Sequence, residues 1–345
     1  MITSVIKTTD PTQAATQGAA ILRAGELVAF PTETVYGLGA DGLNGAAVDK
    51  IFLAKGRPND NPLILHVARP QDAFALWDGE PPFARALMDT FWPGPLTLIY
   101  HKAPRIPNEV TAGLSTVAVR LPESAVAREL ILAAGCPIAA PSANLSGKPS
   151  PTTAEHVYAD MAGKIPLIID GGPCRYGVES TVLSLVGIPT ILRPGAVTRE
   201  MLAAVIGEVA LAPSILQPLQ KGETAASPGM KYKHYAPSAQ VQVVVGEPAA
   251  AARRICELYD GLIAKGKTVR IAATAEAAPF YGSRAYALLG RRLEPISLCS
   301  GLFRLLRELD EGADVILAEG VAPQGAGLAF MNRLLRAAGF QVEYV

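Results

Sequence analysis

Two cationic side chains stand two residues apart in Lys55-Gly56-Arg57, directly before the proline-bounded stretch Pro58-Asn59-Asp60-Asn61-Pro62. If the backbone here is extended, both side chains project to one side and can bind a single anion such as a phosphate group. The same spacing fits a cationic helix C-terminus that interacts with the helix dipole. The spacing alone favours neither interpretation, so the segment is a candidate phosphate site.

Small polar side chains follow the apolar run 137–140, in Pro141-Ser142-Ala143-Asn144-Leu145-Ser146-Gly147-Lys148-Pro149-Ser150. Ligands of α/β sheets bind at the ends of strands, where hydroxyl and amide groups can donate hydrogen bonds to phosphate or ribose. Taken singly, the segment is also typical of an ordinary turn. It is not a Walker loop, because it lacks the upstream glycine and the Ser or Thr directly after the lysine.

Four further residues combine polar chemistry with apolar surroundings. Thr32 and Thr34 belong to Pro31-Thr32-Glu33-Thr34-Val35-Tyr36-Gly37, and His66 ends the apolar run 63–67. Arg120 lies inside the apolar run 117–121. Burying an unpaired charge is costly, so Arg120 needs an anionic partner, and a substrate carboxylate would serve. His66 taken alone is more typical of a hydrogen-bonded structural residue than of a catalytic base.

A glycine pattern makes a nicotinamide-cofactor enzyme a rival hypothesis. Gly37-Leu38-Gly39-Ala40-Asp41-Gly42 matches G-x-G-x-x-G, and Asp60 follows near the distance of a ribose-binding acid. However, residues 31–36 separate the preceding strand from the first glycine, whereas the fingerprint needs that glycine in the strand-to-helix turn. Asp60 also lies among prolines and asparagines, in a loop. We therefore disfavour dinucleotide binding.

Alternating apolar runs and helical patterns must position these residues. Strands are expected at 26–30, 63–67, 96–100, 117–121, 137–140, 167–170 and 181–186, with helices at 45–54 and 124–134. The segment 208–239 shows no hydrophobic periodicity and is rich in Pro and Gly, which indicates a linker. A second alternation follows, with strands at 241–245, 269–273 and 315–318 and helices at 249–264, 301–310 and 328–338. We thus predict an α/β domain at 1–207, a linker at 208–239 and a smaller, parallel, Rossmann-like α/β domain at 240–345.

The composition suits two folded domains and excludes several classes of protein. The 345 residues carry a formal charge of +0, with 50% hydrophobic and 18% charged residues, which argues against disorder and against a global attraction to nucleic acid. No continuous apolar stretch reaches the ~18 residues of a membrane helix. Cys136, Cys174, Cys256 and Cys299 form no C-x-x-C pair, so neither a zinc site nor a disulfide framework is expected. These features predict a cytoplasmic protein without membrane attachment.

Six blocks stand out in order along the first domain: Pro31-Thr32-Glu33-Thr34-Val35-Tyr36-Gly37-Leu38, Lys55-x-Arg57 with Asn61-Pro62-Leu63 and His66-Val67, Phe91-Trp92-Pro93-Gly94-Pro95-Leu96-Thr97, Ala140-Pro141-Ser142-Ala143-Asn144, Ser180-Thr181 and Arg193-Pro194-Gly195. Taken together, these blocks resemble the YrdC-type family, whose two-domain form is the threonylcarbamoyl-AMP synthase. The segment 227–237 is similar to the linker of that form, and Asn332-Arg333-Leu334 is similar to the end of its second domain. The resemblance implies a twisted, mixed, open sheet with helices in the first domain.

The resemblance also implies a set of site residues. Lys55 and Arg57 are the expected catalytic pair, stabilising charge on the phosphates. The implied threonine pocket consists of Thr34, His66, Arg120, Ala140 through its backbone, and Ser180. The implied ATP contacts are Lys55, Arg57, Asn61, Thr116, Ser142, Asn144, Ser150, Arg193 and Tyr235.

The reaction that the resemblance implies joins L-threonine, bicarbonate or carbon dioxide, and ATP into L-threonylcarbamoyl-adenylate and pyrophosphate. Mg²⁺ would accompany ATP, and no set of protein metal ligands is expected. A transferase complex would then pass the threonylcarbamoyl group to tRNA, with at most weak, local tRNA contact by this chain. Because the mixed anhydride hydrolyses, we expect a lid at 227–237, where Lys231, Tyr232, Lys233 and Tyr235 could cover the nucleotide. A passive tether is the alternative for this segment.

Two other functions stay open at this point. An RNA-binding module would use a local basic face, and its RNA affinity would weaken steeply with salt. A relative that uses carbamoyl phosphate would resemble this chain over the first domain only and would carry zinc-binding cysteine pairs, which this sequence lacks.

Overall fold

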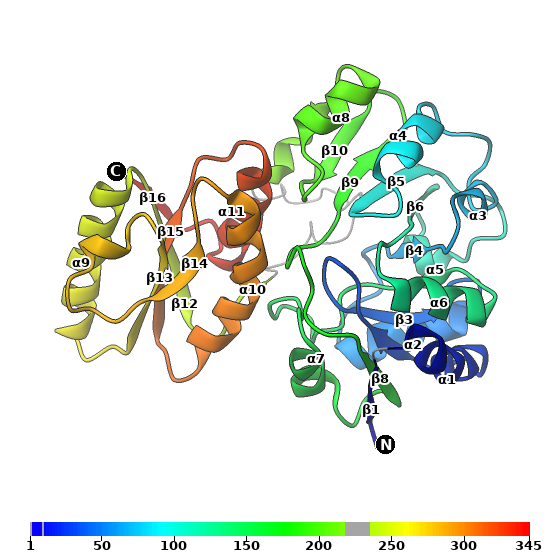
Figure 1. Cartoon of the computed structure of the whole chain (residues 1–345), viewed down its shortest axis with the longest axis horizontal. Helices are drawn as coiled ribbons and strands as arrows, with labels where there is room; N and C mark the ends of the chain where they lie inside the picture. The colour runs from blue at the N-terminus through cyan, green and yellow to red at the C-terminus, as the bar shows by residue number, and fades with distance from the viewer. Residues whose placement is uncertain (1, 9, 218–234) are drawn as a thin grey trace.

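Residues 2–8, 10–217 and 235–345 are described by a computed structural model, in which they form two sheets of eleven and five strands. Each sheet belongs to its own α/β domain, and the two domains lie next to each other (Figure 1). No helix in the described ranges is long and apolar enough to cross a bilayer. The predicted fold class is confirmed.

The first sheet is mixed and open, in the order β1-β8-β2-β3-β7-β4-β6-β5-β9-β10-β11. The sheet contains both parallel pairs, such as β4 with β6, and antiparallel pairs, such as β2 with β3. The strands are β1 (Ser4–Lys7), β2 (Val28–Phe30), β3 (Gly37–Asp41), β4 (Ile64–His66), β5 (Leu96–His101), β6 (Thr116–Arg120), β7 (Ile138–Ala139), β8 (Leu167–Asp170), β9 (Thr181–Ser184), β10 (Thr190–Arg193) and β11 (Ala210–Leu211).

Side-chain caps begin several helices of this domain. Asn44, Ser124, Thr153 and Thr198 each accept a hydrogen bond from a backbone N–H of the first turn, which satisfies a donor that has no partner within the helix. The helices are α1 (Pro11–Arg23), α2 (Gly45–Lys55), α3 (Pro70–Phe74), α4 (Ala84–Phe91), α5 (Asn108–Thr111), α6 (Ala125–Ala134), α7 (Ala154–Met161), α8 (Arg199–Ile206) and the 3₁₀ turn η1 (Pro213–Ile215).

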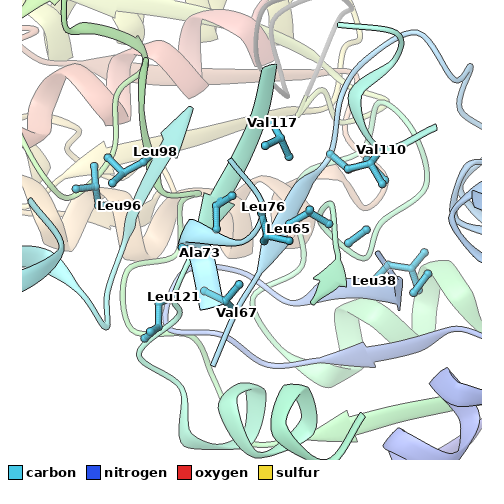
Figure 2. Close-up of a cluster of buried hydrophobic side chains, with 14 of the residues drawn as sticks. Leu38, Leu65, Val67, Ala73, Leu76, Leu96, Leu98, Val110, Val117 and Leu121 are labelled. Carbon is cyan, nitrogen blue, oxygen red and sulfur yellow. The ribbon is translucent and has the colours of Figure 1, made fainter. Parts of the chain in front are cut away.

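The core of the first domain joins side chains from widely separated strands. Figure 2 shows Leu38 of β3, Leu65 of β4 and Val117 of β6 together with Leu76, which follows α3. All four are buried. Since removal of apolar surface from water is the main favourable contribution to folding, this cluster fixes the ends of β3, β4 and β6 relative to one another. Polar residues at those ends are therefore held on a rigid support.

The second sheet is entirely parallel, in the order β14-β13-β15-β12-β16. Helices α10 and α11 lie on the side of this sheet that faces the first domain, and α9 lies on the far side (Figure 1). The elements are β12 (Gln240–Val245), α9 (Pro248–Ile263), β13 (Val269–Thr274), the 3₁₀ turn η2 (Ala278–Phe280), β14 (Ala287–Gly290), α10 (Pro295–Asp310), β15 (Val315–Gly320), α11 (Ala326–Ala337) and β16 (Val342–Tyr344).

Three arginines of the second domain bond to the first. Arg307 of α10 donates to Asp160 of α7 at 2.7 Å, and Arg333 of α11 donates to Glu179 at 2.7 Å. Arg336 of α11 donates to the carbonyl of Ser214 at 2.9 Å. Val35 and Val178 of the first domain also pack into the core of the second. The interface between the two domains therefore contains both apolar packing and ion pairs.

Several boundaries differ from the expectations. Gly37–Asp41 forms strand β3, antiparallel to β2, so the glycine pattern is no strand-to-helix turn and cannot hold a dinucleotide in the expected way. Within the expected linker, β11 pairs with β10 and η1 follows it, because an apolar pair of residues can extend a sheet without any visible periodicity. Helix α10 begins at Pro295 rather than at 301. Most of the expected lid, 227–234, lies outside the described residues.

Candidate functional site

A single pocket gathers most of the residues that the sequence indicated. It encloses about 750 Å³, part of which is open to solvent. Its lining comes from the loop after β2, the end of α2, strands β4 and β6, the loop after β7, and the ends of β9 and β10. The residues are Thr32, Thr34, Val35, Gly37, Lys55, Arg57, Ile64, His66, Arg120, Ala140, Pro141, Ser142, Asn144, Ser146, Gly147, Lys148, Glu179, Ser180, Arg193 and Tyr235.

Lys55 and Arg57 converge through a helix end, which is one of the two arrangements that their spacing left open, rather than through extended backbone. Lys55 is the last residue of α2, and Gly56 adopts a left-handed conformation with φ of 61°. The N–H groups of Gly56 and Arg57 donate to the carbonyls of Leu53 and Phe52, which closes the helix. The reversal places both cationic side chains on the pocket.

The loop after β7 is bound directly to this helix end. The Lys55 ammonium donates to the carbonyl of Asn144 at 2.7 Å and also to that of Ser142. In return, the N–H of Ser146 donates to the Lys55 carbonyl at 2.9 Å. Burial, and next the neighbouring Arg57, hold the pKa of Lys55 well below its ordinary value. The two predicted phosphate segments are therefore one structural unit.

Side-chain bonds hold the loop itself. The Ser142 hydroxyl donates to Asn144 Oδ1 at 2.5 Å, and Asn144 Nδ2 donates to the carbonyls of Leu145 and Lys148 at 2.8 and 2.9 Å. Asn144 is buried. The loop therefore presents preorganised polar groups to the pocket, which lowers the ordering cost of binding a ligand.

Arg120 has an anionic partner within the protein. Its guanidinium donates to Glu33 Oε1 at 2.5 Å, to Thr34 Oγ1 at 2.9 Å and to the Gly94 carbonyl at 3.2 Å. The expected need for an anion is thus met by Glu33, which the sequence analysis did not select. These contacts use three of the five N–H donors of an arginine, and Arg120 still lines the pocket.

His66 is a neutral, buried imidazole at the end of β4. Burial, and then the nearby Arg120 charge, lower the pKa of His66 to about 3. Its ring meets Phe30 edge-on, and its Nδ1 has no hydrogen-bond partner among the described residues. A buried polar atom without a partner is costly unless a ligand satisfies it. His66 thus combines a neutral ring that lines the pocket with an Nδ1 that lacks a partner among the described residues.

Ser180 and Arg193 meet where β9 begins and β10 ends. Arg193 donates to the carbonyl and to the hydroxyl of Ser180, both at 3.1 Å, and Thr97 lies 2.8 Å from the same hydroxyl. Burial lowers the pKa of Arg193 to about 10, which still leaves it charged at neutral pH. Ser180 is thereby fixed from two sides.

Tyr235, the first described residue after 217, belongs to the pocket lining. Its ring packs at 5.0 Å from that of Phe303 in α10, and the next residue donates its N–H to the Gly147 carbonyl at 2.9 Å. Its φ of 65° is unusual for a residue with a side chain. This residue therefore contacts both the second domain and the polar loop of the first.

Three predicted ATP contacts are not among the described lining residues. Asn61 is buried, and its carbonyl accepts a hydrogen bond from Arg57 at 2.7 Å. Ser150 is buried behind the pocket and donates to Glu179 Oε1 at 2.6 Å. Thr116 begins β6, where it pairs with His101. The first two support residues of the pocket, and their predicted contacts with a ligand stay predictions.

The lining has a strongly positive balance. It contains Lys55, Arg57, Arg120, Lys148 and Arg193, whereas Glu179 is the one carboxylate among the described lining residues. Sequence reasoning missed Glu179, although it directly precedes the selected Ser180. Cations, hydroxyl groups and a neutral imidazole around one cavity can hold a polyanion beside a small polar molecule and stabilise charge that develops between them.

Comparisons with known proteins agree over nearly the whole chain. Residues 20–195 match the Sua5/YciO/YrdC model described as telomere recombination, and residues 197–339 match the threonylcarbamoyl-AMP synthase C-terminal domain. The threonylcarbamoyl-AMP synthase of Bacillus subtilis is 48% identical over 99% of this chain and 97% of its own length. That of Pyrococcus abyssi is 49% identical over 94% of both.

A solved structure agrees equally well. The crystal structure of P. abyssi Sua5 complexed with L-threonine matches with a TM-score of 0.93 and 46% identity, covering 100% of both chains. The agreement extends over both domains.

Proposed function

This chain belongs to the threonylcarbamoyl-AMP synthase family, and on that basis we propose how its pocket divides between two substrates. The enzyme converts L-threonine, bicarbonate or carbon dioxide, and ATP into threonylcarbamoyl-AMP and pyrophosphate. This is the first step in forming threonylcarbamoyladenosine in tRNA. The observation that carries the proposal is the meeting of cationic, hydroxylic and imidazole side chains from seven parts of the first domain at one cavity.

ATP occupies the side of the pocket formed by the end of α2 and the loop after β7. Lys55 and Arg57 lie at a helix end that is bonded to Ser142 and Asn144, and Arg193 of β10 lines the same pocket. Charged and hydroxylic donors bind phosphate oxygens strongly. Asn61, Thr116, Ser150 and Tyr235 complete the proposed nucleotide contacts. Asn61 and Ser150 also support the pocket through their hydrogen bonds with Arg57 and Glu179.

Threonine occupies the side formed by β4, β6 and the loop after β2. The relative from P. abyssi was solved with L-threonine, which supports a threonine site in this family. Arg120 attracts the carboxylate, while Thr34, Ser180 and the backbone of Ala140 offer hydrogen-bonding groups. The unsatisfied Nδ1 of the neutral His66 suits a hydroxyl or amine group of the substrate.

The chemistry requires positioning rather than a protein nucleophile. The threonine amine captures carbon dioxide with loss of a proton, and a carbamate oxygen attacks the α-phosphorus of ATP in line, so that pyrophosphate leaves. Lys55, Arg57 and Arg193 stabilise the negative charge on the phosphates during this displacement. Burial of the site limits hydrolysis of the mixed anhydride.

Magnesium enters as part of MgATP. Among the residues that the structure describes, no group of three or more His, Cys, Asp or Glu side chains is arranged to hold a metal ion. Glu179 is the one carboxylate among the described residues that line the pocket, and it already accepts hydrogen bonds from Ser150 and Arg333. Phosphate oxygens and water would therefore supply the ligands, as is usual for Mg²⁺ bound with a nucleotide.

The test is pyrophosphate release from ATP and bicarbonate, with and without L-threonine and without RNA. We expect release to depend on L-threonine and to change little between low and moderate salt. Equal rates without threonine would refute the function. Activity only with added RNA, lost steeply as salt rises, would favour the RNA-binding alternative.

The product is an activated carbamoyl group, so its consumer must be a transferase acting on tRNA. We propose that such a complex acts downstream in the cytoplasm. The check is formation of threonylcarbamoyladenosine when that complex, tRNA and this protein are combined.

A further inference from the structure

An arginine of the second domain reaches a carboxylate at the pocket of the first. Arg333, in the middle of α11, is 0% exposed, and its Nε donates to Glu179 Oε2 at 2.7 Å. Its NH2 group donates to the Glu179 carbonyl at 3.3 Å, and its NH1 group donates to Asn332 Oδ1 at 2.6 Å. One guanidinium therefore binds both the side chain and the backbone of residue 179.

Glu179 stands where an uncompensated carboxylate would oppose ATP binding. It lines the pocket together with Lys55 and Arg193, which the proposed function assigns to the phosphates. Like charges in a buried site repel strongly. A carboxylate there must be either neutralised or directed away from the phosphates, and the described contacts of Glu179 do both: Arg333 binds one oxygen and Ser150 the other.

The charged groups around Glu179 also favour a neutralised, ionised carboxylate at this position. Arg333 faces it from α11, Arg193 from β10 and Lys55 from α2, and the Tyr235 hydroxyl group is also nearby. Burial alone would raise the pKa of Glu179, but Arg333 and Arg193, with the Ser150 hydrogen bond, bring it below the ordinary value. The carboxylate is thus ionised, and a cation from outside the first domain helps to keep it so.

The hydrogen bond from Arg333 to the Glu179 carbonyl also restrains the next residue, Ser180. Ser180 follows Glu179, and its carbonyl and hydroxyl both accept hydrogen bonds from Arg193. Fixing the Glu179 carbonyl therefore also restrains the segment that orients Arg193 toward the pocket.

We propose that Arg333 is a positioning residue for the nucleotide site: it holds Glu179 away from the phosphates, so that the pocket of the first domain is complete only with α11 docked against it. The inference rests on the proposed function, because it assigns the phosphates to this side of the pocket. A purely structural Arg333 would affect stability alone. A positioning residue also affects ATP affinity, and the size of that effect depends on the charge of Glu179.

The chain offers a matched control inside the second domain. Arg292 pairs with the fully buried Glu319 at 3.1 Å, and Glu319 also accepts hydrogen bonds from Thr274 and Tyr281. This pair is ionic and has a fully buried carboxylate, its arginine side chain is 16% exposed, and neither of its members lines the pocket. Arg292→Met therefore measures the effect on stability alone of removing a largely buried arginine from a buried carboxylate.

The experiment compares the wild type with Arg333→Met, Arg333→Lys, Glu179→Gln, the double variant Glu179→Gln/Arg333→Met, and Arg292→Met. The KM for ATP and kcat are measured from pH 6 to 9, and the Kd of MgATP is measured by calorimetry. In Arg333→Met we expect the KM for ATP to rise by about tenfold or more, because a buried charge loses its partner. The rise should grow with pH, since Glu179 ionises progressively without its partner.

Charge removal should restore binding. The double variant should have a lower KM for ATP than Arg333→Met, and its pH dependence should be that of the wild type. Arg333→Lys should lie between Arg333→Met and the wild type, and Arg292→Met should keep the wild-type KM and pH profile even if its melting temperature falls. If Arg333→Met does not fold, the KM for ATP and its pH dependence are compared between the wild type, Arg333→Lys and the double variant instead.

A wild-type KM and pH profile in Arg333→Met would overturn the proposal, as would a double variant no better than Arg333→Met. The calorimetric Kd separates this result from a failure of the proposed function. If the wild type releases no threonine-dependent pyrophosphate, the function is wrong, whereas Arg333 is still tested by the MgATP affinities of the same variants.

Discussion

His66 shows how a single residue can link the site to pH. Its pKa is about 3 in the folded protein, compared with an ordinary value of 6.5, because burial and Arg120 disfavour the charged imidazole. Between these pH values the unfolded chain binds a proton that the folded protein does not. The stability that this residue contributes is therefore fully present above pH 6.5 and is lost as the pH falls below it.

The first prediction concerns the pH dependence of stability. The melting temperature of the wild type should fall as the pH is lowered from 7.5 to 5, and in His66→Gln this fall should be smaller because the titrating group is gone. Thermal unfolding followed by circular dichroism across this range measures both curves. Curves of equal slope would show that His66 takes up a proton in the folded protein.

Lys55 combines a chemical and a structural role. Its ammonium bonds the carbonyls of Ser142 and Asn144 and faces the proposed phosphates, so Lys55→Met removes both interactions. We expect threonine-dependent pyrophosphate release to fall by about 100-fold or more, as with loss of a preorganised electrostatic group. Two carbonyls would also lose their donor, which should lower the free energy of unfolding by roughly 1–3 kcal/mol.

The control for this variant lies on the same helix. Lys50 pairs with Glu26 at a half-exposed position, so Lys50→Met should change stability by no more than about 1 kcal/mol and leave turnover intact. Urea denaturation and the pyrophosphate assay measure both variants. Equal turnover in Lys55→Met and Lys50→Met would contradict the role of Lys55.

At the level of elements, the site depends on a close approach between β9 and the residues after β10. A Cβ at Gly195 would lie 2.3 Å from the N atom of Thr181 and 2.7 Å from the carbonyl carbon of Ser180. These are backbone atoms within a sheet and cannot shift independently. Any side chain at 195 would therefore push Ser180 away from Arg193.

The third prediction follows from this contact. Gly195→Ala should reduce threonine-dependent turnover by about tenfold or more, since displacement of site residues by fractions of an ångström is costly to catalysis. Gly187→Ala, in the turn between β9 and β10, is the matched control: its φ is 69° and a Cβ there meets nothing within 4 Å. It should cost about 1–2 kcal/mol of stability without loss of turnover. Wild-type activity in Gly195→Ala would contradict the argument.

The elements also show what sequence reasoning could and could not reach. Long apolar runs such as Leu167–Asp170 were placed correctly because burial on both faces leaves a clear pattern. Strand β3 was missed because Gly37 and Gly39 weaken any strand signal. Their small size is needed because Phe30 packs against both of them and Ile138 packs against Gly39, which only the fold reveals. Ala210–Leu211 was taken for linker, since two residues cannot show a period.

Within the site, the residues missed share a physical reason. Anion-binding sites are predicted from cations and hydroxyl groups, so the carboxylates Glu33 and Glu179 were not predicted. Both nevertheless lie next to predicted site residues, Thr34 and Ser180. Their roles arise from charge compensation by Arg120 and Arg333, which lie 87 and 154 residues away in the chain. Pairings at such distances are properties of the fold, and one sequence without its fold does not reveal them.

At the scale of the whole molecule, Arg307 offers a test of how the domains hold together. It is largely buried and donates to Asp160, whose side chain is 0% exposed and also accepts from Lys148. Arg307→Met would leave Asp160 with one cation instead of two. Arg304 of the same helix pairs only at the surface with Glu308, among the described residues.

The fourth prediction compares these two arginines. Arg307→Met should lower the free energy of unfolding by roughly 1–3 kcal/mol, whereas Arg304→Met should change it by no more than about 0.5 kcal/mol. Urea denaturation of both variants provides the measurement. Similar small changes in both would mean that the Arg307 contact adds nothing to the docking of the domains.

The pairing of Glu179 with Arg333 also has a consequence for synthesis on the ribosome. At about 5–20 residues per second, roughly 8–30 s pass between the translation of Glu179 and that of the arginine 154 positions later. During this interval the nascent first domain holds an acidic group in its cavity without the countercharge supplied by α11. A growing chain should thus capture nucleotide poorly until translation is nearly finished, which would keep half-made protein from consuming ATP.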